Sequence, residues 1–62
     1  MFQLTFETDN AAFGSEENQN TDDMAYEIER ILNKVKTQVV SGYTEHVILD
    51  INGNIVGSWE LI

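Results

Sequence analysis

The stretch that decides the fold covers residues 21–41 and reads TDDMAYEIERILNKVKTQVVS. Its apolar side chains recur at spacings of three and four, which places them on one stripe of an α-helix. The stripe consists of Met24, Ile28, Ile31, Leu32, Val35 and Val39. Gly42 follows, and glycine is the residue type that most often ends a helix. We therefore expect one amphipathic helix from Thr21 or Asp22 to Ser41, packed against a sheet.

The segment before this helix predicts a strand and then a long loop. Phe2, Leu4 and Phe6 alternate with polar residues, as in a strand that buries one face. Residues 8–20 are rich in Asn, Asp, Ser, Glu and Gly, which favours a loop. Loops of this length in compact domains are usually functional or mobile.

The segment after the helix predicts a β-hairpin with strands at residues 43–50 and 54–61. Asn52-Gly53 between them fits two registers, a two-residue turn or a type I turn with a Gly bulge. The second pairs Asp50 with Asn54. We favour it, because Asp is common at the first position of a type I turn and Gly at the fourth.

The favoured register predicts a positive φ at Gly53 and also predicts which side chains share a face. One face would carry Tyr43, Val47, Leu49, Ile55, Gly57, Trp59 and Leu61. The expected core is then Leu4, Phe6, Ile28, Ile31, Val35, Val47, Leu49 and Trp59. Ile48 and Val56 would lie on the opposite face near His46, as an exposed patch for self-association or partner contact.

Together the elements predict a single α+β domain, residues 1–62, with the order β-α-β-β. One helix would cover one face of a three-stranded antiparallel sheet, with the first strand beside the last in the order 1-3-2. A chain this short buries only about 60% of its unfolded surface, so both a monomer and a homodimer remain open. The absence of cysteine excludes disulfides and thiolate metal sites.

Charge is the strongest compositional signal. The net charge is −8, and residues 1–29 contain eight acids and no base, whereas residues 30–62 contain three of each. Such a field repels nucleic acid and anionic membrane and attracts a basic protein surface. If the loop and helix acids gather on one side, they form a negative patch for that partner. The candidate partner-binding residues are Glu16, Glu17, Asp22, Asp23, Glu27 and Glu29.

No pattern in the sequence predicts catalysis, a cofactor or a metal site. His46 is the only histidine, and no positioned partner for acid–base work accompanies it. The acidic loop lacks EF-hand spacing, and the glycine in residues 50–54 is misplaced for a calcium loop. We also expect no signal peptide, because the N-terminus has no basic start and no apolar h-region. We expect no membrane span, because no apolar run approaches about 20 residues. The expectation is a soluble, non-enzymatic binding protein.

Three stretches carry a family resemblance: FETDNAAF at 6–13, EIERIL at 27–32 and DINGNIVGSWEL at 50–61. They resemble a family of very small proteins encoded by bacteriophages and mobile elements, and are similar to small acidic anti-CRISPR proteins of type I systems. The resemblance implies an inhibitor in the host cytoplasm that binds the CRISPR surveillance complex and blocks recognition of target DNA. The acidic half fits this implication, because such complexes hold DNA in basic channels.

The alternative is a small phage accessory or assembly module that self-associates or binds a protein partner through its sheet face. The position of the carboxylates on the folded surface separates the two hypotheses. A contiguous acidic ridge beside a polar sheet face favours the DNA-mimicking inhibitor. Scattered acids beside an apolar sheet face favour the module.

Overall fold

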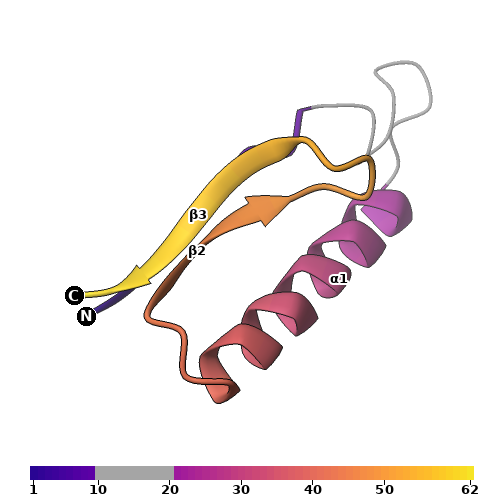
Figure 1. Cartoon of the computed structure of the whole chain (residues 1–62). Coiled ribbons are helices and arrows are strands. Elements are labelled where there is room, and N and C mark those ends of the chain that lie inside the picture. The colour runs from indigo at the N-terminus through magenta and orange to yellow at the C-terminus, as the bar shows by residue number, and fades with distance from the viewer. Residues whose placement is uncertain (10–20) are drawn as a thin grey trace.

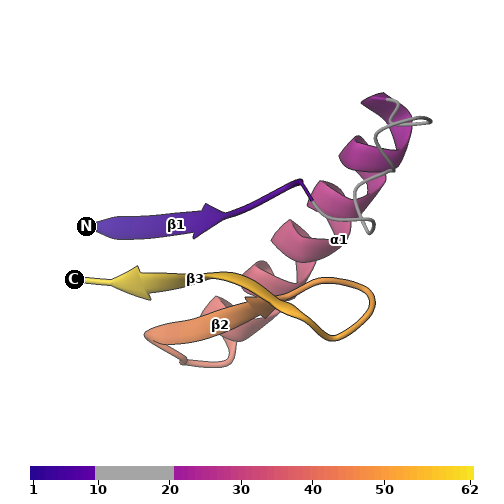
Figure 2. The same ribbon diagram turned by 90° about the horizontal axis from the view of Figure 1, so that it is seen from above.

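The computed structural model describes residues 1–9 and 21–62. Its elements, in chain order, are β1 (Phe2–Phe6), α1 (Thr21–Val40), β2 (Glu45–Leu49) and β3 (Ile55–Leu61). The strands form an antiparallel sheet in the order β1-β3-β2, and α1 lies along one of its faces (Figures 1 and 2). The predicted α+β fold and strand order are confirmed. Within the described ranges, no helix combines the length and hydrophobicity needed to cross a membrane.

Gly42 ends α1 as predicted. It adopts a φ of 99°, and its N–H donates to the carbonyl oxygen of Val39 at 3.1 Å. The N–H of Tyr43 donates to the carbonyl oxygen of Gln38, also at 3.1 Å. These two bonds satisfy carbonyls of the last helical turn, and glycine reaches the left-handed conformation without a steric penalty. The chain is thereby turned back toward β2.

The hairpin turn also follows the favoured prediction. The N–H of Asp50 donates to Asn54 O at 2.9 Å, and the N–H of Gly53 donates to Asp50 O at 3.0 Å. Gly53 has a φ of 85°. The Asp50 carboxylate accepts hydrogen bonds from the backbone of Asn52 and from the backbone and side chain of Asn54, at 2.8–3.2 Å. Asp50 is buried, and its carboxylate oxygens hold the turn together.

Beyond the turn, β3 contains a β-bulge. Leu49 pairs with Ile55, but Ile48 pairs with Gly57, which leaves Val56 as an extra residue. An extra residue shifts the pairing by one position, and a shift of one reverses the faces on which the side chains of the partner strand lie. The inner and outer faces of β2 are therefore exchanged relative to the prediction.

The predicted positions of Val47, Leu49 and Ile48 are wrong for this reason, and so is that of Val56 in the bulge. Val47 and Leu49 do not lie in the core but are 43% and 44% exposed. Ile48 and Val56 do not form an exposed patch: Ile48 is only 3% exposed, and Val56 packs against the core. Tyr43 and Ile55, assigned to the buried face by the same register, are exposed as well. Leu61 lies on the same face as Trp59, as predicted, but is exposed at the end of β3.

The core lies between α1 and the sheet. Ile31, Val35, Ile48 and Trp59 are buried, and Leu4, Phe6, Met24, Ile28 and Val56 pack against them. Trp59 is 1% exposed, as predicted from its place beside the helix stripe. Its ring stacks on Phe2 with a centroid distance of 5.7 Å, and its Nε1–H donates to Gln38 Oε1 at 2.7 Å. The core is thus a single layer between one helix and one face of the sheet.

Candidate functional site

The face of the sheet turned away from α1 carries a row of exposed side chains. We call it the open sheet face, and it consists of Gln3, Thr5, Glu45, Val47, Leu49, Ile55, Ser58 and Glu60. In both Figure 1 and Figure 2 the helix lies on the other side. No other part of the described chain covers this face.

The open sheet face has an apolar half and an acidic half. Val47, Leu49 and Ile55 form the apolar half, with Ile55 69% exposed. In the acidic half, Glu45 stands directly opposite Glu60 across β2 and β3. Like charges in this position destabilise a sheet. Among the described residues, no ion pair neutralises either carboxylate.

Of the acids predicted to bind a partner, only Asp23, Glu27 and Glu29 have described side chains, and these three do not gather on one side. Glu16 and Glu17 lie outside the described residues, and the side chain of Asp22 is likewise not described. Asp23 and Glu29 are exposed on α1. Six residues apart at about 100° each, they point to different sides of the helix. The remaining exposed acids of the described ranges lie on other segments: Glu7, Asp9, Glu45 and Glu60.

Glu27 differs from the other candidates because it is 5% exposed and its carboxylate is engaged inside the fold. It forms an ion pair with Arg30 and accepts a hydrogen bond from the N–H of Ile51 at 3.1 Å. Arg30 also donates to the carbonyl oxygen of Leu49 at 2.9 Å. Glu27 and Arg30 therefore fasten α1 to the hairpin, and Glu27 does not belong to an exposed acidic surface.

Glu27→Gln is expected to lower the free energy of unfolding by about 1–3 kcal/mol, because a buried charge-assisted network is lost. Glu29→Gln is the matched control, since it removes the same charge from an exposed position two residues away. Its effect should stay within about 0.5 kcal/mol. Urea unfolding followed by Trp59 fluorescence measures both variants, and equal losses would contradict the proposed fastening role.

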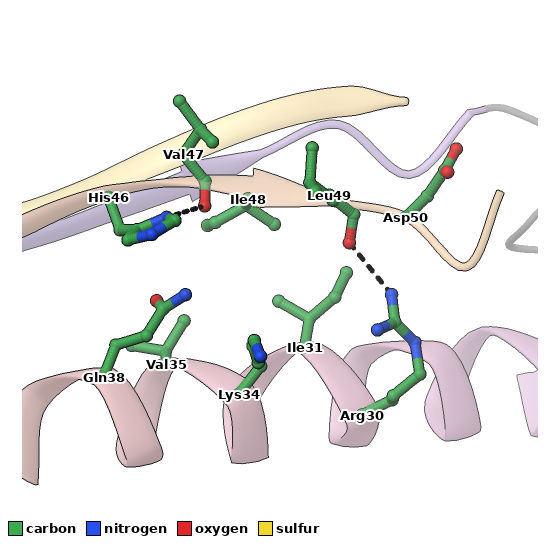
Figure 3. Close-up of a pocket in the computed structure, with 10 residues that line it drawn as sticks. All are labelled: Arg30, Ile31, Lys34, Val35, Gln38, His46, Val47, Ile48, Leu49 and Asp50. Atoms are coloured by element: carbon green, nitrogen blue, oxygen red, sulfur yellow. Dashed lines mark hydrogen bonds between the residues drawn. The ribbon is translucent and has the colours of Figure 1, made fainter. Parts of the chain in front are cut away.

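A cleft of about 190 Å³ lies between α1 and β2 (Figure 3). Its floor is apolar, formed by Ile31, Val35 and Ile48, and its rim is polar. The rim includes Arg30, Lys34 and Gln38 from α1 and His46 from β2.

His46 occupies the inner side of β2, opposite Trp59, and not the outer face that was predicted. Its Nδ1 lies 3.0 Å from the carbonyl oxygen of Val47. A carbonyl can only accept, so Nδ1 carries the proton and the neutral ring offers Nε2 as an acceptor. The ring also meets the edge of Tyr43 at 5.4 Å. These contacts fix the imidazole at the rim of the cleft.

The described ranges contain no group of three His, Cys, Asp or Glu side chains able to hold a metal ion. Comparison with protein-family models, with curated proteins and with solved structures finds no match.

Proposed function

We propose that this chain is a non-enzymatic binding protein that docks on a protein partner through the open sheet face. The observation that carries the proposal is the exposed apolar group Val47, Leu49 and Ile55 beside the opposed carboxylates of Glu45 and Glu60. The acids of the described ranges are scattered, and beside a partly apolar sheet face this favours a docking module over a contiguous acidic ridge.

The two halves of the face have different physical roles in docking. Burying the three aliphatic side chains supplies affinity at about 25 cal/mol per Å² of apolar surface removed from water. A Lys or Arg of the partner placed between Glu45 and Glu60 relieves their repulsion, so the pair favours partners that are basic at this point. The partner surface is therefore apolar with adjacent positive charge.

A basic nucleic-acid-binding channel has this chemistry, and the sequence resemblance points to the channel of a type I CRISPR surveillance complex. Docking there would exclude target DNA, which makes the chain an inhibitor that acts in the host cytoplasm. The net charge of −8 supports fast, salt-sensitive association with such a surface. Exposed acids away from the contact, such as Asp23 and Glu29, contribute to this steering.

Competition between target DNA and this chain for a purified surveillance complex, over a salt series, tests the proposal. The double variant Val47→Ser/Ile55→Ser should raise the concentration needed for inhibition about tenfold or more, because it removes the apolar contact. Glu45→Gln/Glu60→Gln should weaken inhibition and reduce its dependence on salt.

A third variant, Glu16→Gln/Glu17→Gln/Asp23→Asn, removes three charges from the loop and helix and leaves the open sheet face intact. It should slow association but keep most of the inhibition. If it abolishes inhibition while the sheet variants retain it, an acidic DNA-mimicking surface replaces the sheet face as the contact. If no variant or wild-type chain inhibits but the chain self-associates through Val47 and Ile55, the assembly module is correct.

A further inference from the structure

The cleft between α1 and β2 concentrates positive charge in a strongly acidic chain. Arg30 and Lys34 are two of the three basic residues, and both line it together with the only histidine. Arg30 is neutralised by Glu27. Lys34 forms no ion pair with any described residue.

The carboxylates nearest to the cleft are directed elsewhere. Asp50 also lines it, but its oxygens accept three hydrogen bonds within the hairpin turn. Glu27 is held by Arg30 and by the N–H of Ile51. An anion that enters near Lys34 therefore meets one uncompensated positive charge and no carboxylate turned toward it.

The polar groups of the cleft converge from both walls. His46 projects from β2 toward α1, whereas Gln38 projects from α1 toward the strand, with Lys34 on the same helix (Figure 3). The bond from Nδ1 to Val47 fixes the ring of His46, and the bond from Trp59 fixes the amide of Gln38. Two of the three groups are thus held in place before any ligand arrives, which lowers the entropy cost of binding.

We propose that this cleft binds a small organic monocarboxylate with an apolar body. The carboxylate lies against the Lys34 ammonium and the amide N–H of Gln38, and the apolar body lies on Ile31, Val35 and Ile48. One uncompensated cation matches one negative charge, and the apolar floor requires a hydrocarbon or aromatic portion. A volume of about 190 Å³ equals that of about six water molecules, so the ligand is of fragment size.

The indole N–H of Trp59 is a built-in reporter of the cleft. The chain has one tryptophan, so its ¹H–¹⁵N spectrum contains one indole signal, and this group is bonded to Gln38 at the rim. Titration of the full chain with hexanoate at pH 7 and constant ionic strength should shift this signal and the Ile48 amide saturably, with a Kd of about 1 mM. 1-Hexanol should bind about fivefold more weakly and hexylamine should give no saturable shift, because both lack the negative charge.

Lys34→Gln and Lys36→Gln form a matched pair, because both remove one positive charge from α1 and only Lys34 lines the cleft. Lys34→Gln should weaken hexanoate binding about fivefold, whereas Lys36→Gln should leave it unchanged. If both variants lost the same amount of hexanoate affinity, the change in net charge would explain the loss, and the proposed site would be overturned. Equal binding of hexanol and hexanoate, or no saturable shift with hexanoate, would overturn it as well.

Discussion

Gly57→Ala should unfold the domain or lower the free energy of unfolding by about 3 kcal/mol or more. A Cβ at this position would lie 2.0 Å from the carbonyl oxygen of Thr5, and 2.6 Å and 2.7 Å from Cα and Cβ of Phe6. These atoms belong to β1, which pairs with β3 at this point. The clash involves backbone atoms of β1, so rotating a side chain cannot relieve it. The strand β1 would have to move away from β3.

Circular dichroism during thermal unfolding measures this effect. Ser58→Ala is the control, because Ser58 is the next residue and is exposed on the open sheet face. It should change stability by no more than about 0.5 kcal/mol. A Gly57→Ala protein with the wild-type melting temperature would show that β1 and β3 do not approach as closely as described.

Ile31→Ala is the second large effect, with an expected loss of about 2–5 kcal/mol. Ile31 is 1% exposed and packs in the buried cluster with Val35, Ile48 and Trp59. Truncation leaves a cavity. Because the core is a single layer between one helix and one face of the sheet, no second layer of side chains can move in to fill it. A core of this size rarely supplies more than about 3–5 kcal/mol, so this one substitution can exhaust the stability of the domain.

Leu32→Ala separates this cavity effect from helix propensity. Leu32 follows Ile31 in the same helical stripe but is 48% exposed, and alanine is as good a helix former as leucine. Its truncation should cost less than about 1 kcal/mol. Urea unfolding curves of the two variants give the comparison, and similar midpoints would mean that the buried side of α1 is assigned incorrectly.

The element order followed from local signals that the structure confirms. The helical spacing, Gly42 at the helix end and the turn held by Asp50 and Gly53 are each set by a few neighbouring residues. The facing of β2 was mispredicted because it depends on the extra residue Val56, which lies beyond the turn. Gly57 inside a predicted strand was the available signal, since such glycines often mark a bulge.

The candidate site was harder to predict, because the tertiary structure decides which acidic side chains are exposed. Glu27 looked like one more surface acid, and its ion pair with Arg30 was visible as an i, i+3 spacing on a helix. Its second partner, the N–H of Ile51, lies 24 residues away and depends on how the hairpin meets α1. Glu45 and Glu60 became neighbours only through the register that the bulge creates.

The hydrogen bonds that Arg30 and His46 make to β2 have a consequence for aggregation. β2 is an edge strand, and an edge strand presents unpaired backbone groups on which another chain can add a strand. The guanidinium of Arg30 donates a hydrogen bond to the carbonyl oxygen of Leu49, and the imidazole of His46 donates one to the carbonyl oxygen of Val47. A strand from another molecule would have to displace both side chains before it could pair, so this edge is protected against intermolecular β-sheet growth.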